Sequence, residues 1–336
     1  MPLDWLDDSI STVANTLGME TFVLKGVLAV ILVCAMCGML GSMVVGNRMA
    51  FFSDAMAHCA FAGVALGYLS VLLSGGDKAL ATWVVPLVMV AVGIAVGAAM
   101  VYVRDNTGLA HDTVIGVFFA LAIGFGAMLY QVLSVKFSFN PESFFFGNLV
   151  LIPDEDLFFL IVLAVVVTPL FTWRYNQLVF ASFNPTLGRT RGLSLTLNNY
   201  LFIIILALVV NLSLKVVGAL LINAMLVVPG AAAANLSRNL RQMFWLTFAF
   251  CLGSGLLGFA LRNTLEVRIG GGAPIAFGPS GVIVVTSVAV FFATMVAGAV
   301  WNRFAPVLGW APLPLRGIRH VHDDTCSADH GFGQCP

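Results

Sequence analysis

Long apolar stretches, each about as long as a membrane-spanning helix, alternate along the chain with short polar connections. A helix needs about 20 mostly apolar residues to cross the hydrocarbon core of a bilayer. Nine stretches meet this requirement: residues 22–45, 52–73, 79–102, 112–133, 156–173, 199–214, 216–235, 242–262 and 277–301. The pattern therefore predicts an all-α fold, a polytopic membrane helix bundle with about nine transmembrane helices.

Two connections are longer than turns. Residues 137–152 are apolar, but they are too short and too broken by Pro141 and Gly147 to cross the membrane. We expect them to form a re-entrant or surface half-helix on the outer side. Residues 174–198 form the longest predicted cytoplasmic loop, which mixes apolar anchors with Arg189 and Arg191. Such a loop can carry a short amphipathic helix that docks against a partner.

Composition narrows the class of protein. Hydrophobic residues make up 60% of the 336 residues, and charged residues make up 10%, against about 25% in a soluble domain. Mean hydropathy is +0.99. Sixteen basic residues balance sixteen acidic ones, which leaves no basic surface for a nucleic-acid partner. These values exclude a soluble enzyme, a disordered chain and a nucleic-acid-binding protein.

The positions of Lys and Arg in the loops predict the orientation. With the N-terminus outside, ten of these residues lie on the cytoplasmic side and five on the outer side. Nine spans then place the C-terminus in the cytoplasm. We therefore divide the chain into an extracytoplasmic leader (1–21), a transmembrane domain (22–301) and a cytoplasmic C-terminal tail (302–336).

Asp54 and His58 are the strongest candidates for chemistry. They lie four residues apart in the second span, so a helix places both on one face. Ionisable residues inside a span cost about 2.5–3.5 kcal/mol on insertion scales and by default mark function. A carboxylate and an imidazole are ligands for Zn, Mn or Fe. The competing interpretation is an Asp–His hydrogen bond that locks two helices.

Asn223, in the seventh span, lies at a depth comparable to that of His58 and close to Pro229, which should kink its helix. Asn223 is a third candidate ligand, although a helix–helix hydrogen bond is the favoured interpretation. Cys34 and Cys37 form a C-x-x-C pattern inside the first span, where small packing residues are the favoured interpretation.

An intramembrane serine protease is one alternative. Gly278, Pro279, Ser280 and Gly281 match the G-x-S-G sequence of rhomboid-type enzymes. Such an enzyme needs a histidine base in a later span, and the next histidine is His320, in the tail. A turn that starts a helix is therefore the favoured interpretation.

The tail is rich in histidine and cysteine and poor in apolar residues, and we expect it to be disordered without a ligand. Side chains of this kind bind borderline metals such as zinc, but their spacing matches no standard zinc finger. The tail is therefore either inert or a cytoplasmic metal acceptor or sensor. The candidate ligands are His320, His322, Cys326, His330 and Cys335.

Three stretches resemble the permease subunit of bacterial ABC importers for zinc, manganese or iron. Residues 41–67 are similar to the family's second span, with Asp54 and His58 on its Asp and His positions. Residues 112–130 resemble its fourth span, and residues 213–236 its V-G-x-L-L and P-A-A-x-A segment. The resemblance extends from about residue 20 to about residue 292.

The resemblance implies a transport subunit of the bacterial inner membrane rather than an enzyme, with ATP hydrolysis in partner chains. It implies cytoplasmic ATP-binding subunits, an extracytoplasmic metal-binding protein, and a second permease copy as a homodimer or similar paralogue. Zn²⁺, Mn²⁺ or Fe²⁺ would be transported, with no permanently bound cofactor. The implied ATPase-docking residues are Asn184, Pro185, Thr186, Gly188, Arg189, Arg191 and Gly192. Further alternatives are an ABC permease for a chelated-metal or cobalamin-like ligand and a secondary transporter, for which we see no inverted repeat.

Overall fold

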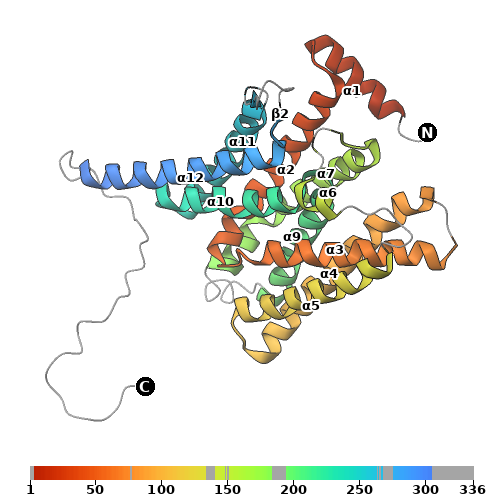
Figure 1. Cartoon of the computed structure of the whole chain (residues 1–336). Coiled ribbons are helices and arrows are strands. Elements are labelled where there is room, and N and C mark those ends of the chain that lie inside the picture. Colours follow the sequence, from red (N-terminus) through yellow and green to blue (C-terminus); the bar gives the residue numbers. More distant parts are fainter. Residues whose placement is uncertain are drawn as a thin grey trace, which may run out of the picture.

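The computed structural model describes residues 4–75, 78–133, 141–147, 149, 151–183, 194–262, 264, 266–267 and 275–304. Within these ranges, nine helices are long and apolar enough to cross a membrane, which confirms the predicted bundle (Figure 1). They are α2 (Thr21–Gly46), α3 (Phe52–Leu73), α4 (Lys78–Thr107), α5 (His111–Leu133), α7 (Asp154–Phe183), α9 (Leu195–Val217), α10 (Ala219–Leu236), α11 (Leu240–Arg262) and α12 (Pro279–Phe304).

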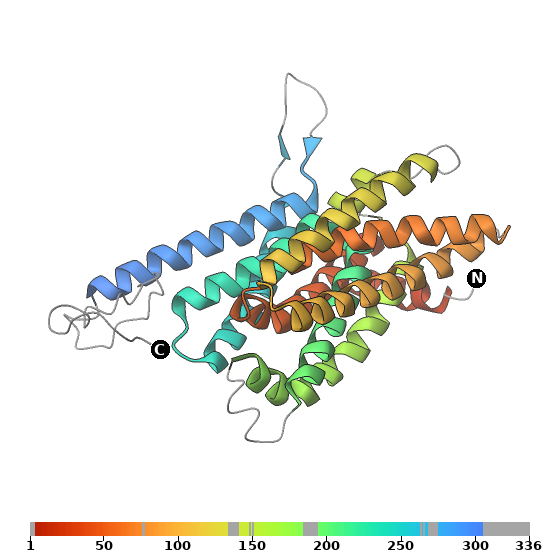
Figure 2. The ribbon, with the colours of Figure 1, turned by 90° about the horizontal axis from the view of Figure 1, so that it is seen from below.

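In the described residues, four smaller elements lie outside these nine helices. The leader contains helix α1 (Asp4–Leu17), at the opposite end of the bundle from the C-terminal end of α12 (Figure 2). The half-helix expected in the connection after α5 is α6 (Pro141–Phe146). Strands β1 (Glu266–Val267) and β2 (Ile275–Ala276) pair as an antiparallel ribbon that projects from the bundle. The all-α prediction missed this ribbon, because two-residue strands are too short to produce an alternating pattern.

Small residues let the helices approach closely. A Cβ atom on Gly63 of α3 would lie 2.9 Å from the Cα of Met89 on α4. One on Gly41 of α2 would lie 2.6 Å from the carbonyl oxygen of Leu226 on α10. Close backbone approach at small residues is how helices pack without a hydrophobic driving force in lipid. These contacts hold α3 against α4 and α2 against α10.

One predicted boundary is wrong. Residues 174–183 were expected in the cytoplasmic loop, but they continue α7 to Phe183. Arg174 donates a hydrogen bond to Gln177 across one turn, at 2.9 Å, and its guanidinium lies 4.7 Å from the ring centre of Trp173. Leu178 is buried in the core. Arg174 and Gln177 therefore lie on a helix whose apolar face continues beyond them.

The turn between α2 and α3 sets where Asp54 enters the bundle. Arg48 adopts a left-handed backbone conformation, with φ of 58°. Its N–H donates to the carbonyl of Val45, and that of Met49 donates to Val44. This pair of bonds is the Schellman arrangement that closes a helix C-terminus. The reversal is tight, so α3 begins at Phe52 and carries Asp54 in its first turn.

Candidate metal site

The carboxylate of Asp54 is bound by a residue from a distant part of the chain. Asn223 Nδ2, on α10, donates a hydrogen bond to Asp54 Oδ1 at 2.8 Å. The two residues are 169 positions apart in sequence, so this bond fixes the start of α3 against α10. The sequence placed Asn223 at a depth comparable to that of His58, and its observed partner, Asp54, lies one helical turn before His58. The hydrogen bond favoured for Asn223 is present, and its partner is the candidate ligand itself.

His58 lies one helical turn beyond Asp54 and is half-buried. Its ring meets Phe119 of α5 edge-to-face, with centroids 4.8 Å apart, and Phe145 of α6 at 5.7 Å. The two phenyl rings belong to different helices, α5 and α6, and together they restrict the orientation of the imidazole. This aromatic enclosure could not be derived from the spacing of Asp54 and His58.

Asn223 also offers an unused acceptor. Its Oδ1 is buried and has no hydrogen-bond partner among the described residues. Leaving a buried amide oxygen unpaired costs about 1–3 kcal/mol, and a cation would remove that cost. Together, the carboxylate, the imidazole and this amide oxygen supply oxygen and nitrogen donors that suit a divalent transition metal.

The site in one chain is sparse. Within the ranges that the structure describes, no three His, Cys, Asp or Glu side chains gather in a way that could hold a metal ion. A metal ion held by Asp54 and His58 would therefore need further ligands from Asn223, from water or from another chain. A sparse ligand set suits a transport site, where an ion must leave as readily as it enters.

Helix α6, which carries Phe145, is anchored by its C-terminal end. Gly147 has φ of 70° and Gly218 has φ of 84°. A Cβ atom on either glycine would collide with the backbone at the other. Ser280, the first-turn residue of α12, donates a hydrogen bond of 2.6 Å to the carbonyl oxygen of Phe146. Its hydroxyl therefore holds a structural bond at a helix start, which supports the turn interpretation of this sequence over a protease nucleophile.

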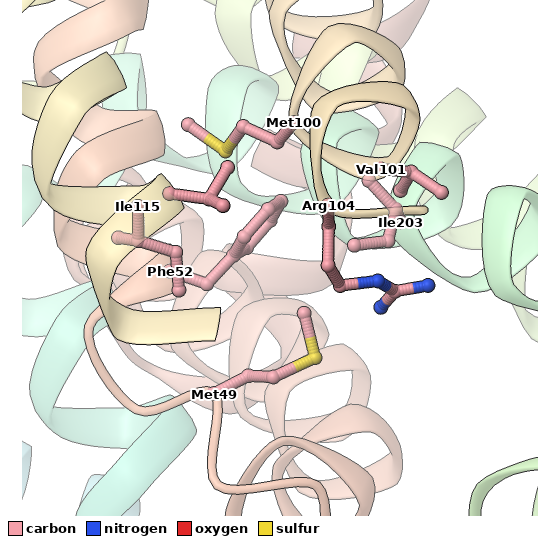
Figure 3. Close-up of a pocket in the computed structure, with 8 residues that line it drawn as sticks. Met49, Phe52, Met100, Val101, Arg104, Ile115 and Ile203 are labelled. Atoms are coloured by element: carbon pink, nitrogen blue, oxygen red, sulfur yellow. The ribbon is translucent and has the colours of Figure 1, made fainter. Parts of the chain in front are cut away.

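A small pocket lies close to the turn between α2 and α3 and is distinct from the metal-ligand pair (Figure 3). Its lining is apolar except for Arg104, whose guanidinium points away from Phe52 and Ile115 and pairs with Asp105. The pocket contains no carboxylate or imidazole that could bind a metal. Its lining residues are Met49, Phe52, Met100, Val101, Arg104, Val114, Ile115 and Ile203.

Two ion-pair groups near the start of α7 were missed by the sequence analysis. Lys25 Nζ lies 2.7 Å from Asp7 and 2.6 Å from Asp154. Lys215 Nζ lies 2.5 Å from Asp156, whose side chain is only 9% exposed. Each lysine could be noticed in the sequence as a charge near the end of an apolar stretch. The local pattern did not identify the acidic partner of either lysine.

The remaining candidates lie outside the described residues. These are the docking residues Asn184, Pro185, Thr186, Gly188, Arg189, Arg191 and Gly192. They also include the tail candidates His320, His322, Cys326, His330 and Cys335.

Within the described residues, nine helices of spanning length form a membrane bundle, and Asp54 and Asn223 meet between two of them. The family comparison identifies the chain as a transport component rather than an enzyme. The ABC 3 transport family matches residues 19–298, and the chain belongs to this family. It is therefore an ABC transporter permease subunit of the metal type.

Curated relatives are similar to this chain over most of its length. The chain is 26% identical over 250 residues to the manganese import system permease protein ScaB of Streptococcus gordonii, covering 74% of this chain and 85% of that protein. It is 24% identical over 251 residues to a probable iron transport system membrane protein of Haemophilus influenzae, covering 74% and 87%.

Solved structures share the fold. PsaBC from Streptococcus pneumoniae, in complex with a Fab, superposes with a TM-score of 0.66 at 23% identity, covering 85% of this chain and 95% of that chain. A metal-chelate type ABC transporter in an inward-facing conformation gives a TM-score of 0.56 at 14% identity, covering 82% and 85%.

Proposed function

We propose that this permease subunit imports divalent Zn, Mn or Fe into the cytoplasm by alternating access, powered by a separate ATPase subunit. The observation that carries the proposal is the hydrogen bond between Asp54 and Asn223 inside the bundle, with His58 one helical turn beyond Asp54. Charged and polar ligands at such a position are expensive in a membrane. The cost is explained if these residues bind a cation as it crosses the membrane.

The donor types limit the ion without choosing one metal. Carboxylate and amide oxygens with one imidazole suit Mn and Fe as well as Zn. The relatives named for manganese and for iron support these two metals. A chelated or cobalamin-like ligand, the alternative, would be recognised at its periphery and would not require the Asp54–His58 pair inside the bundle.

We propose that a second copy of the chain completes the pathway. On α5, which packs beside α3, Gly116, Ala120 and Gly124 are exposed. Nothing in the described structure lies within 4 Å of a Cβ placed on either glycine. A stripe of small residues in a membrane helix suits close contact with another helix. Pairing there would bring a second Asp54 and His58 close to the first.

The two-copy arrangement has a direct test. We expect a cysteine at Ala120 to cross-link two copies of the full chain in the membrane. A cysteine at Val165, an exposed position on α7, is the matched control and should cross-link weakly. Equal cross-linking at both positions would contradict the proposed pairing face.

We propose that the ATP-binding subunits dock on the 184–192 segment from the cytoplasm, and that an extracytoplasmic metal-binding protein delivers the ion at the α1 end. This requires the N-terminus outside and the C-terminus inside. A cysteine at Thr190 should then react with impermeant reagents only from the cytoplasmic side, with protection by the ATPase. A cysteine at Ser74, exposed at the far end of α3, should react only from outside. Reversed labelling would overturn the orientation.

The central test is metal uptake. We expect Asp54→Ala and His58→Ala to abolish accumulation of the transported metal while the protein still reaches the membrane. Asp112→Ala removes an exposed carboxylate from the first turn of α5 and is the matched control. Uptake of radioactive Mn²⁺, Fe²⁺ and Zn²⁺, each competed by the others, identifies the metal. Normal uptake by both site variants would refute the assignment.

For the tail, we propose a cytoplasmic role in accepting zinc or sensing it. Its imidazoles and thiols suit zinc better than manganese. Truncation after Arg319 should change zinc uptake or its dependence on cytosolic zinc. A truncated chain that matches the full chain at low and high zinc would show that the tail is inert, without affecting the Asp54–His58 assignment.

A further inference from the structure

A cluster of sulfur atoms lies in the bundle apart from the proposed transport site. Cys34 and Cys37 of α2 and Cys251 of α11 are all buried. The Cβ of Cys251 lies 3.3 Å from the Cβ position on Gly38, four residues beyond Cys34 on α2. The Sγ atom of Cys34 lies so close to Gly255 that a Cβ on this glycine would collide with it. Cys34 and Cys251 therefore lie beside a tight crossing between α2 and α11.

Methionine 225, on α10, adds a thioether to this cluster. The Sγ of Cys251 lies 4.0 Å from Met225 Sδ. The Cε of Met225 lies 3.6 Å from the Cβ position on Gly255, the glycine that Cys34 also contacts. The thiols of Cys34 and Cys251 and the thioether of Met225 thus converge on one turn of α11.

The cluster is joined to a break in the hydrogen bonding of α10. Pro229 has no N–H, so the carbonyl of Met225, four residues earlier, loses its helical donor. The thiol of Cys251 donates to that carbonyl at 3.7 Å. The proton on Cys251 therefore compensates, weakly, for the missing bond of α10.

We propose that Cys34 and Cys251 form a binding site for a soft, thiophilic metal ion, with Met225 Sδ as an additional donor. Thiolate and thioether ligands select soft ions. Mercuric ion is the clearest case: Hg²⁺ bonds to both sulfurs and displaces their two protons to solvent, with no change of oxidation state. The product, one divalent ion with two thiolates, is neutral. Neutrality matters because an uncompensated charge in an apolar interior is costly.

The geometry favours a low coordination number. As noted for the transport site, no preformed group of three His, Cys, Asp or Glu ligands exists in the part of the chain described here. A tetrahedral zinc site is therefore not supported. Two thiolates suffice for a linear mercuric complex. The oxygen and nitrogen donors around Asp54 favour a different class of ion, so the two sites are chemically distinct.

Occupancy of this thiol site has a consequence for α10. Binding removes the Cys251 proton that Met225 accepts and fastens α2 to α11 beside the Pro229 break. Asn223, which holds Asp54, lies two residues before Met225 on the same helix. A bound soft ion therefore inhibits movement of α10 and, with it, metal transport. This second statement rests on the proposed function, whereas the binding site does not.

The binding test uses the purified full chain in detergent and mercuric chloride as the probe. Cys59, Cys326 and Cys335 are first replaced with Ser, which leaves the three clustered thiols. We expect one Hg²⁺ per chain, with an ultraviolet mercury–sulfur absorption band and the loss of two of three reactive thiols. Cys34→Ala and Cys251→Ser should each weaken binding by about tenfold or more, because a single thiolate remains at the site.

Cys37→Ser is the matched control, because it removes a neighbouring buried thiol and leaves the proposed ligands in place. Its mercury affinity should be unchanged. Ser at position 251 can still donate to the Met225 carbonyl, so this variant separates ligand loss from misfolding, and thermal unfolding checks it. Unchanged binding in both Cys34→Ala and Cys251→Ser, or loss of binding in Cys37→Ser alone, would overturn the site.

The transport test uses proteoliposomes that contain the permease with its ATPase partner. Mercury should inhibit metal uptake in the three-cysteine background and should inhibit the Cys34→Ala variant at about tenfold higher concentration or more. Equal inhibition of both would overturn the coupling to α10 while the binding result stands. Absence of uptake before mercury is added would count against the proposed function alone.

Discussion

The hydroxyl of Ser280 donates a hydrogen bond of 2.6 Å to the backbone carbonyl of Phe146, a residue 134 positions earlier in the chain. This bond ties the first turn of α12 to the end of α6. Phe145, the preceding residue of α6, lies against His58. The bond therefore connects the sequence that resembled a protease nucleophile to the aromatic enclosure of the metal-ligand pair.

The first prediction follows from that bond. Ser280→Ala should leave the Phe146 carbonyl without its donor and destabilise the protein by about 1–3 kcal/mol. It should also slow metal uptake, because Phe145 is no longer held in place. Thermal unfolding in detergent and uptake in proteoliposomes measure the two effects.

Ser287 provides the control on the same helix. Its Oγ is buried and has no partner among the described residues. Removing that hydroxyl in Ser287→Ala should be neutral or stabilising. Equal losses in the two alanine variants would show that the Ser280 bond contributes nothing specific.

The contact between Gly147 and Gly218 gives a second prediction. Gly218→Ala would place a Cβ against the backbone at Gly147 while keeping φ near 84°. We expect severe destabilisation, beyond the 1–2 kcal/mol or so of a left-handed backbone conformation alone. Gly108→Ala is the control, since Gly108 has φ of 66° but open space around it. A similar fall in melting temperature in both variants would argue against the close contact.

Asn223 supports a third prediction. Asn223→Leu removes both the hydrogen bond to Asp54 and the free amide oxygen, whereas Asn223→Ser keeps a short oxygen donor. We expect the Leu variant to raise the KM for metal by about tenfold or more, since partners that orient a ligand affect affinity on this scale. The Ser variant should retain most uptake. Identical kinetics in the two variants would remove Asn223 from the site.

Much of the fold could be predicted because apolar runs of spanning length need no tertiary information. The boundary predicted at Arg174 was wrong because its position depends on tertiary packing. Arg174 and Gln177 are polar, and only the burial of Leu178 shows that the helix continues. The β1–β2 ribbon was likewise invisible, because pairing between two-residue strands depends on the intervening chain rather than on local pattern.

Part of the candidate site could likewise be predicted from the sequence, and part could not. Asp54 and His58 could be found because their spacing is local and their chemistry is unusual in a span. Their contacts with Asn223, Phe119 and Phe145 depend on which helices become neighbours. Helical periodicity does not encode that choice.

The last prediction concerns Asp156 and Lys215. The Asp156 side chain is 9% exposed and that of Lys215 is 33% exposed, with their charged atoms 2.5 Å apart. Removing the lysine leaves a buried, unpaired carboxylate, whereas removing the carboxylate leaves an ammonium that reaches solvent. Lys215→Met should therefore destabilise by about 1–3 kcal/mol, and Asp156→Asn by less. The double variant should recover much of the loss, because it buries no charge and therefore has no desolvation cost. A double-mutant cycle of unfolding free energies measures this coupling.

Asp7→Asn, at the more exposed ion pair with Lys25, is the control and should change stability by about 0–1 kcal/mol. If Lys215→Met proves no more harmful than Asp7→Asn, then Asp156 is not held as a buried charge in the folded protein.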